Sequence, residues 1–219
     1  MTATIRLCRD LFPNGISSVV LCSFLLSAIK MDILLEGNRI QRMSDMKVLK
    51  DYVTTIPDFP KEGILFRDIT TVIEDPEGFR LAVDGLIDLL KDLDFDLVLG
   101  SESRGFVFGA PVAYAMDKGL VLVRKRGKLP RQTISESYEL EYGEATLEIH
   151  TDSIKKGQRV VIIDDLIATG GTTGAVIRLI ERLGGVVVKI CFVMELAGLK
   201  GREALKGYDM DSLIIYEGK

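Results

Sequence analysis

The sequence is poor in the side chains on which several large classes of enzymes and metal proteins depend. His150 is the only histidine in 219 residues, which argues against a histidine-based catalytic triad and against a histidine-rich metal site. The three cysteines, Cys8, Cys22 and Cys191, form no CxxC pair and have no metal-ligand spacing. This pattern indicates reduced thiols in a cytoplasmic protein.

An excess of positive charge is also missing. The chain has 28 Lys and Arg against 32 Asp and Glu, a formal net charge of −4. Non-specific nucleic-acid binding depends on basic side chains that neutralise phosphates, so we expect no nucleic-acid partner. The hydrophobic content of 47% suffices for a core, and the length suits one domain with or without an appendage.

The apolar run near the N-terminus is too short to span a bilayer. Ile16 to Ile29 has 14 mostly apolar residues, whereas a spanning helix needs about 20, so we expect no membrane partner. No convincing A-x-A cleavage site follows the run. We expect residues 1–42 to be a non-native or wrongly assigned extension before a domain at 43–219, with Met43 or Met46 as the true start. The alternative is a genuine signal peptide or membrane anchor.

Strand-like and helix-like patterns alternate along the rest of the chain. Short runs of branched aliphatic residues predict buried strands at 97–100, 121–123, 160–163 and 186–194. Helical spacing of apolar residues predicts helices at 45–54, 75–93, 106–116 and before Gly184. The polar and aromatic stretch 127–144 suits an exposed hairpin or lid. This alternation predicts an α/β fold with right-handed crossovers and a mostly parallel sheet.

The most informative run is Val160 to Thr173. Four branched aliphatics predict a strand covered on both faces, and Asp164 and Asp165 follow at its carboxyl end, where open α/β sheets bind ligands. A loop of small residues then opens a helix, so backbone N–H groups and the helix dipole can hold an anion. Carboxylates beside an anion loop indicate a ribose phosphate. The loop consists of Ala168, Thr169, Gly170, Gly171 and Thr172.

Two further runs have a composition that suits anion binding. Gly100 to Phe106 follows a predicted strand and precedes a helix, and Arg104 within it is a planar, bidentate donor. Arg124 to Pro130 is a basic cluster in an acidic protein, in which Lys125 comes directly after a predicted strand. The alternative for each run is a solvated turn with charged side chains, the usual fate of such sequences.

Together these motifs resemble the signature of the type I phosphoribosyltransferases. The segments Phe66–Thr70, Ser103–Gly109, Arg124–Pro130, Leu140–Gly143 and Leu147–Ile149 resemble the adenine-specific branch of that family, in the family's order, from about residue 44 to the C-terminus. The resemblance implies a mostly parallel twisted sheet flanked by helices, with a small N-terminal hood and a lid hairpin. It also implies Mg²⁺, a homodimer, and transfer of the phosphoribosyl group from phosphoribosyl pyrophosphate to adenine, giving AMP and pyrophosphate.

The resemblance assigns roles to individual residues. It places the ribose hydroxyls on Asp164 and Asp165 and the 5-phosphate on the loop 168–172. A non-proline cis peptide is expected at Glu102–Ser103, and no metal is expected on dedicated protein ligands. The pyrophosphate group would be held by Glu102, Ser103, Arg104, Lys125 and Lys128, of which Lys128 engages on lid closure. The catalytic residues would be Glu141, Arg104 and Lys125.

For the base, the resemblance implies that adenine packs on Phe66, is read by backbone groups near Leu65 and Arg67, and is covered by Leu196. An alternative for Phe66 is a place in the core. Glu141 would approach adenine N7 or the reacting ribose. Enzymes of the family that act on hypoxanthine and guanine have an acid where this chain has Ala168, which disfavours a 6-oxopurine.

Two alternative functions remain at this stage. A phosphoribosyltransferase for xanthine, guanine or orotate would keep the fold, but it is disfavoured by Ala168 and by the lid motif Leu140–Gly143. A non-catalytic phosphoribosyl pyrophosphate sensor would need an effector module, and residues 1–42 are apolar with no helix-turn-helix spacing. A generic phosphate-binding module is a weaker candidate than either.

Overall fold

The computed structural model describes residues 47–139 and 144–218. The chain divides into two units, Met1–Lys47 and Val48–Lys219, and all elements given below belong to the second. The expected extension at 1–42 and the expected lid residue Glu141 lie outside the described residues. Within the described ranges, no helix is long and apolar enough to cross a membrane.

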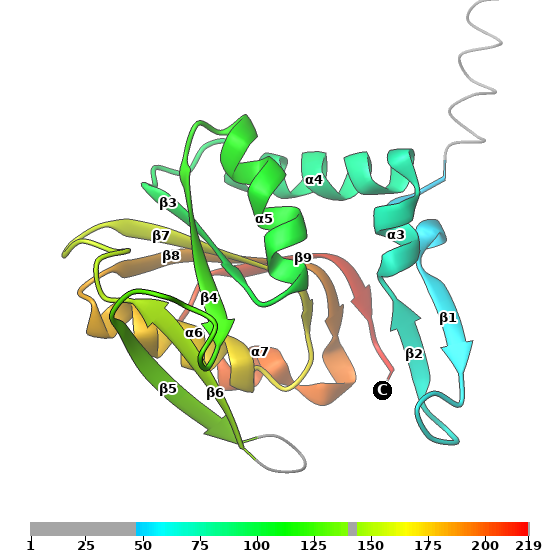
Figure 1. The fold of residues 1–219 in the computed structure, drawn as a ribbon. Helices are drawn as coiled ribbons and strands as arrows, with labels where there is room; N and C mark the ends of the chain where they lie inside the picture. Colours follow the sequence, from blue (N-terminus) through cyan, green and yellow to red (C-terminus); the bar gives the residue numbers. More distant parts are fainter. Residues whose placement is uncertain (1–46, 140–143, 219) are drawn as a thin grey trace, which may run out of the picture. The chain divides into compact units, whose positions relative to one another are not determined.

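The described residues form a main sheet of seven strands in the order β5-β6-β4-β3-β7-β8-β9 (Figure 1). The five strands from β4 to β9 in that order are parallel, whereas β6 pairs antiparallel with both β4 and β5. The parallel strands are β3 (Leu97–Ser101), β4 (Gly119–Lys125), β7 (Arg159–Ile167), β8 (Val186–Leu196) and β9 (Met210–Tyr216). All four strands predicted from sequence are present, and the mostly parallel α/β sheet is confirmed.

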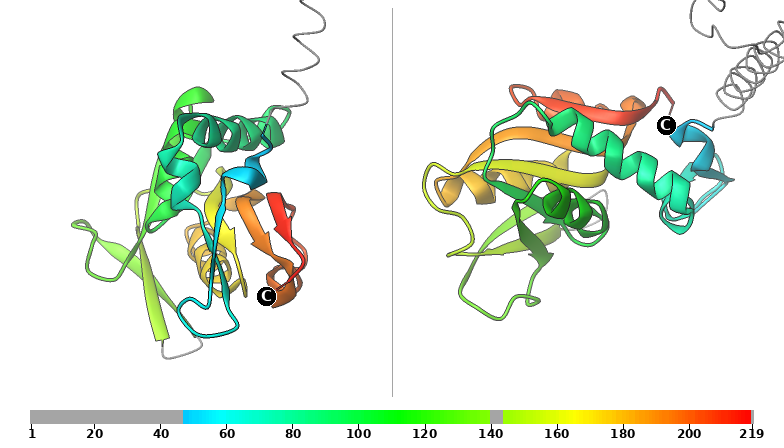
Figure 2. Two further views of the ribbon diagram at one scale, coloured as in Figure 1. Left: turned by 90° about the vertical axis from the view of Figure 1, so that its right-hand side faces the viewer. Right: turned by 90° about the horizontal axis from the view of Figure 1, so that it is seen from above.

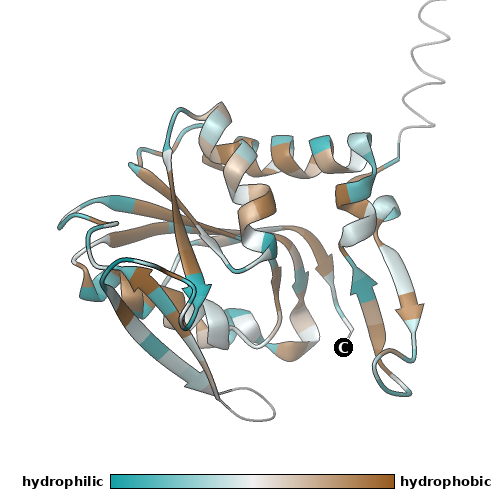
Figure 3. Ribbon diagram, viewed as in Figure 1, coloured by the Kyte–Doolittle hydropathy of each residue, from teal (hydrophilic) through white to brown (hydrophobic). Residues whose placement is uncertain are grey.

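Helices cover both faces of this sheet (Figure 2). α4 (Pro76–Leu90) and α5 (Arg104–Ala115) pack on one face, and α6 (Gly171–Arg182) packs on the other. Strand β7 is apolar on both sides because helices cover both faces of the sheet. Its successive side chains alternate between these two faces. Val161 and Ile163 join the α4–α5 core, whereas Val160 and Ile162 join the α6 core. Figure 3 shows the hydrophobic residues concentrated in these central strands.

The helix starts follow their sequence signals. Asp75 caps α4 by accepting hydrogen bonds from the N–H groups of Glu77 and Gly78, at 2.9 and 3.0 Å, with Pro76 at the first helical position. α6 begins after Gly170, whose positive φ favours glycine. The short helices are α3 (Thr70–Glu74), α7 (Gly201–Ala204) and the 3₁₀ turns Leu49–Tyr52 and Ala197–Leu199.

A two-stranded hairpin, β1 (Thr54–Pro57) with β2 (Leu65–Asp68), forms the N-terminal hood. The helix predicted over 45–54 is wrong in the described part of that range. Only the turn Leu49–Tyr52 is helical, and strand β1 begins at Thr54. The β-branched residues from Val53 to Ile56 explain the strand, because they lose less side-chain freedom there than in a helix.

A hairpin is present in the lid region, formed by β5 (Thr133–Glu139) and β6 (Glu144–His150), and it extends beyond the predicted range 127–144. Two residue pairs join β6 to β4, Arg124 with Glu148 and Lys125 with Leu147. The N–H of Gly127 also donates to the Glu148 carboxylate at 2.9 Å. The hairpin is therefore anchored at the carboxyl end of β4.

Candidate phosphoribosyl-binding site

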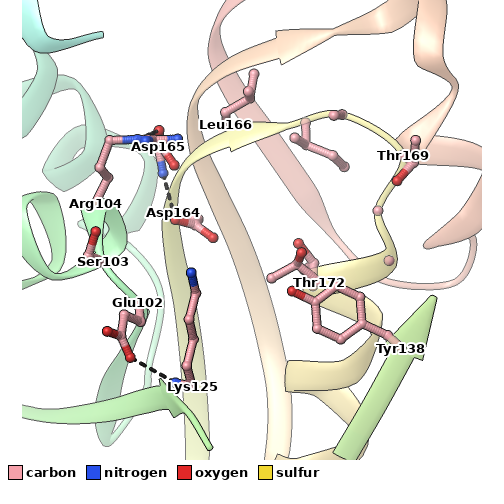
Figure 4. Close-up of a pocket in the computed structure, with 15 residues that line it drawn as sticks. Glu102, Ser103, Arg104, Lys125, Tyr138, Asp164, Asp165, Leu166, Thr169 and Thr172 are labelled. Atoms are coloured by element: carbon pink, nitrogen blue, oxygen red, sulfur yellow. Dashed lines mark hydrogen bonds and ion pairs between the residues drawn. The ribbon is translucent and has the colours of Figure 1, made fainter. Parts of the chain in front are cut away.

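A cavity of about 400 Å³ opens at the carboxyl ends of β3, β4 and β7 (Figure 4). This is the edge where parallel α/β sheets bind ligands. The residues predicted to bind ribose 5-phosphate and most of those predicted to bind pyrophosphate line this cavity. The cavity is lined by Glu102, Ser103, Arg104, Lys125, Tyr138, Asp164, Asp165, Leu166, Ile167, Ala168, Thr169, Gly170, Gly171, Thr172 and Thr173.

The acidic pair is held by residues from neighbouring strands and helices. Asp165 is only 6% exposed, and the Nε of Arg104 donates to it in an ion pair. The buried Ser101 hydroxyl donates to Asp164. Burial and the charge of Asp165 raise the pKa of Asp164 to about 8, although the Ser101 hydrogen bond acts in the opposite direction. Burial beside a second carboxylate therefore favours the neutral form of Asp164.

Gly105 allows Arg104 to approach the acidic pair. A Cβ at position 105 would meet the carbonyl oxygen of Ile163 at 2.8 Å and the Oδ1 of Asp164 at 2.9 Å. Any larger residue would therefore push the first turn of α5 away from β7. Glycine at position 105 is therefore required for steric reasons, next to the charged donor Arg104.

The loop from Ala168 to Thr172 leads into the N-terminus of α6. Gly170 has φ +84° and lies so close to Gly201 that a Cβ would meet its carbonyl oxygen at 2.9 Å. The first N–H groups of a helix have no partner within the helix and carry its positive dipole. The loop and the first turn of α6 therefore offer several donors to one anion.

Glu102 and Lys125 lie next to each other where β3 and β4 end, and the Lys125 side chain extends toward Asp164 (Figure 4). The carboxylate of Glu102 accepts from the backbone N–H of Lys125 at 2.7 Å and from the guanidinium of Arg124 at 3.3 Å. Burial raises the pKa of Glu102, but these donors outweigh burial and leave the pKa below its usual value. Glu102 is thus occupied within the protein and holds the end of β4. The Glu102–Ser103 peptide is cis, as expected.

The expected pyrophosphate residue Lys128 does not line the cavity. Its side chain is exposed, and its carbonyl oxygen accepts a long hydrogen bond of 3.5 Å from Arg124. The lysine lies in the turn between β4 and β5, three residues beyond the last residue of β4. Its proposed role would need movement of that turn.

The four residues expected at adenine do not line this cavity. Three lie on β2 of the hood, and Leu196 is the last residue of β8. Leu65 and Phe66 are 43% and 38% exposed, so the alternative that Phe66 fills the core is wrong. The guanidinium of Arg67 lies 4.3 Å from the centre of the Tyr216 ring, and Tyr216 pairs with Leu196. Tyr216 therefore contacts Arg67 on the hood and lies beside Leu196 in the sheet.

Sequence reasoning missed three residues here. Tyr138 reaches the cavity from β5, Ser101 holds Asp164, and Tyr216 links Arg67 to Leu196. Alternation along β5 could have indicated which lid side chains face inward, but Ser101 and Tyr216 depend on pairings between distant strands. Among residues 47–139 and 144–218, no group of three or more His, Cys, Asp or Glu could hold a metal ion.

Comparison with known proteins agrees with this geometry. A family model described as a phosphoribosyl transferase domain matches residues 73–217. The adenine phosphoribosyltransferase of Agathobacter rectalis is 59% identical over 174 residues, which cover 80% of this chain and 100% of that relative.

Solved structures are similar as well. The adenine phosphoribosyltransferase of Thermoanaerobacter pseudethanolicus is 52% identical with a TM-score of 0.74, covering 77% of this chain and 98% of that one. The Saccharomyces cerevisiae enzyme, solved with an imino-altritol bisphosphate and adenine, is 40% identical with a TM-score of 0.71. That match covers 75% of this chain and 96% of the yeast chain.

Proposed function

This chain belongs to the phosphoribosyltransferase family, and from that membership and its cavity we infer that it transfers the phosphoribosyl group of phosphoribosyl pyrophosphate to adenine, which yields AMP and pyrophosphate. The observation that carries the inference is the acidic pair Asp164–Asp165 beside the anion loop at the start of α6. The identity to adenine-specific relatives selects the base. The biological role is adenine salvage.

In this reaction, adenine N9 forms a bond to ribose C1 as the bond from C1 to the pyrophosphate oxygen breaks, and the N9 proton is lost. Positive charge develops on the sugar and negative charge on the leaving group. We assign the ribose hydroxyls to Asp164 and Asp165 and the 5-phosphate to Ala168, Thr169, Gly170, Gly171 and Thr172. Catalysis then depends mainly on positioning and electrostatics.

Binding of the ribose needs a change in the acidic pair. Arg104 forms an ion pair with Asp165, and it would be shared with, or released to, pyrophosphate when substrate binds. Lys125 and Arg104 are the proposed cations for the leaving group, with Ser103 and the backbone near Glu102. Lys128 would join them if the turn before β5 closes.

Mg²⁺ suits this site because hard carboxylate oxygens and substrate phosphates are the ligands it takes, usually with several waters retained. We propose that it is held mainly by oxygens of phosphoribosyl pyrophosphate and by water, near Asp164 and Asp165. When bound, it neutralises charge on the pyrophosphate. The protein's own part is to orient the sugar and to supply Arg104 and Lys125.

For the base, we propose that adenine stacks on Phe66, meets backbone groups of Leu65 and Arg67, and is covered by Leu196. The exposure of Phe66 and the closeness of Arg67 to the β8–β9 edge support this placement. Stacking gives affinity, and hydrogen bonds to the base edge give selectivity. Glu141, outside the described residues, is proposed to approach adenine N7 or the ribose.

We also propose that the enzyme is a cytoplasmic homodimer. The buried, unpaired Cys191 suits a reducing compartment. Val107 on α5 and Leu122 on β4 are each 36% exposed, and a second copy would cover such apolar side chains. Light scattering of the purified protein would test the dimer.

The deciding experiment measures AMP and pyrophosphate formation with phosphoribosyl pyrophosphate and magnesium. Adenine, hypoxanthine, guanine and orotate are compared as acceptors. We expect turnover with adenine alone. Turnover with an oxopurine or orotate would overturn the base assignment. Binding of phosphoribosyl pyrophosphate without turnover of any base would instead support a sensor.

A further inference from the structure

The lid hairpin contributes one described side chain to the cavity, Tyr138 of β5. Alternate residues of a strand point to the same face, so Ile134, Glu136 and Tyr138 share the face toward α6. Ile134 and Tyr138 pack against the core cluster that α6 helps to form. The opposite face carries Ser137, which hydrogen-bonds Thr146 across the hairpin at 3.0 Å. Tyr138 is therefore directed inward by the strand itself.

Ion pairs fix this part of β5 to α6. The Glu136 carboxylate accepts from Arg178 Nε at 2.5 Å and from Arg182 Nη1 at 2.9 Å, and Arg182 also donates to the Ser135 carbonyl at 2.7 Å. These hydrogen bonds hold the pKa of Glu136 below its usual value. Because α6 begins at the anion loop, β5 and that loop are held to one helix.

The Tyr138 hydroxyl is available to a ligand. Its ring is half-buried, so its position is constrained by packing. Figure 4 shows the ring beside Thr172, at the loop end of the cavity and away from Arg104. Within residues 47–139 and 144–218, the hydroxyl makes no hydrogen bond. A phenol with an unused donor beside several backbone N–H groups completes an anion site.

Building on the proposed function, we propose that the Tyr138 hydroxyl donates a hydrogen bond to the 5-phosphate of phosphoribosyl pyrophosphate and of AMP. The β5 strand then takes part in phosphate binding, because the Glu136 ion pairs hold it on α6. The 5-phosphate is the group nearest Thr172 in the proposed placement, whereas pyrophosphate belongs to the Arg104 end and adenine to the hood.

The test compares ligands with and without a 5-phosphate on the Tyr138→Phe variant. The change removes only the hydroxyl, so the melting temperature should stay the same. Calorimetry should show about tenfold weaker binding of AMP and of ribose 5-phosphate, the size of a lost hydrogen bond to a charged group. Adenosine binding should not change. Tyr114→Phe, on the exposed side of α5, is the matched control and should bind all three ligands as the parent does.

The outcomes separate this proposal from the reaction itself. If the parent converts adenine to AMP but Tyr138→Phe binds ribose 5-phosphate as tightly as the parent, the proposal is wrong and the reaction stands. Equal losses for AMP and adenosine would also overturn it, because the ring would then be a general wall of the site. If the parent binds ribose 5-phosphate but makes no AMP, the proposed reaction fails while a phosphate-specific loss in Tyr138→Phe still supports Tyr138.

Glu136 provides a second readout. As a positioning residue, it should act on phosphate affinity only through Tyr138. Glu136→Gln should weaken AMP binding in the parent, and the same change should have little further effect in Tyr138→Phe, which a double-mutant cycle measures. Additive losses would show that the Glu136 ion pairs act independently of the Tyr138 hydroxyl and would contradict the proposed positioning.

Discussion

The proposed sugar-phosphate end and the proposed base end of this site are built in different ways. At the sugar-phosphate end, the groups stand on strands of the main sheet, and Asp165 and Ser101 are 6% and 2% exposed. At the base end, the assigned groups lie mainly on the hood hairpin, where Phe59 and Phe66 are 51% and 38% exposed. The two rings pack edge to face, with their centroids 5.1 Å apart. At one end the acidic pair is already bonded within the protein, whereas the other end leaves apolar surface open.

In the proposed placement, the two substrates depend on different interactions. Phosphoribosyl pyrophosphate would compete with ion pairs and hydrogen bonds that are already formed, so we expect its affinity to depend on exchange of partners. Adenine would cover exposed apolar surface, so we expect its affinity to depend on burial and stacking. Substitutions at one end should therefore change the kinetics of one substrate and leave those of the other nearly constant.

The largest effect is expected at the sugar-phosphate end. Arg104→Ala removes a cation from the leaving group and leaves the buried Asp165 without its partner. We expect kcat/KM for phosphoribosyl pyrophosphate to fall about 10³-fold, and the melting temperature to fall as well. Steady-state kinetics and thermal melting measure both. Arg80→Ala on the exposed side of α4 is the control, and a loss below fivefold at Arg104 would contradict the assigned role.

The base end should respond through adenine alone. Phe66→Ala removes the proposed stacking surface, and we expect KM for adenine to rise about 30-fold, because aromatic stacking on a base contributes about 1–3 kcal/mol. KM for phosphoribosyl pyrophosphate and the melting temperature should change little, since Phe66 is exposed. Ile56→Ala, its cross-strand neighbour, controls for damage to the hairpin. Equal increases in both KM values would abolish the contrast between the ends.

The acidic pair should give the sugar-phosphate end a pH dependence that the hood lacks. The pKa of Asp164 is raised from 3.8 to about 8 in the folded state. The folded protein therefore keeps a proton there that the unfolded chain loses, so this group lowers the free energy of unfolding as pH rises from about 4 to about 8. Asp164→Asn has no such proton to lose.

We therefore expect Asp164→Asn to raise the melting temperature of the ligand-free protein more at about pH 8.5 than at about pH 5. Thermal melting across this range checks the sign. Phe66→Ala serves as the comparison, because its change in melting temperature should not depend on pH. A gain for Asp164→Asn that shrinks as pH rises would show that the carboxyl is not protonated in the empty site.

The smallest effect is expected from removing residues 1–42. Every group assigned to either substrate, apart from Glu141, lies within the described part of the unit Val48–Lys219. A protein beginning at Met43 should keep both KM values and kcat within about twofold of the full chain, measured side by side. A selective change in KM for adenine would show that the extension acts on the base end.

The contrast between the ends also explains which features could be predicted from sequence. The anion loop and the acidic pair lie in one run of 14 residues, where strand, carboxylates and helix start follow each other directly. Local patterns such as Asp75–Pro76 gave a helix start that the structure confirms. Such features depend on neighbouring residues, so a single sequence is enough to predict them.

Features that join distant segments could not be predicted in this way. The Arg104–Asp165 ion pair spans 61 residues, and sequence reasoning gave Arg104 to pyrophosphate alone. The helix expected at 45–54 failed because its apolar spacing also fits a turn followed by a strand. Lys128 is expected to reach pyrophosphate only on lid closure, and its place outside the described cavity leaves that prediction untested.

The hydrogen bond between Ser101 and Asp164 joins residues 63 positions apart on two adjacent parallel strands. We therefore expect Asp164 and Asp165 to reach their places only when β7 has entered the sheet between β3 and β8. Helices form within microseconds, but such non-local strand pairing is slow. The return of ribose 5-phosphate binding during refolding should accordingly lag behind the return of helical signal, and the delay measures how long the central strand takes to insert.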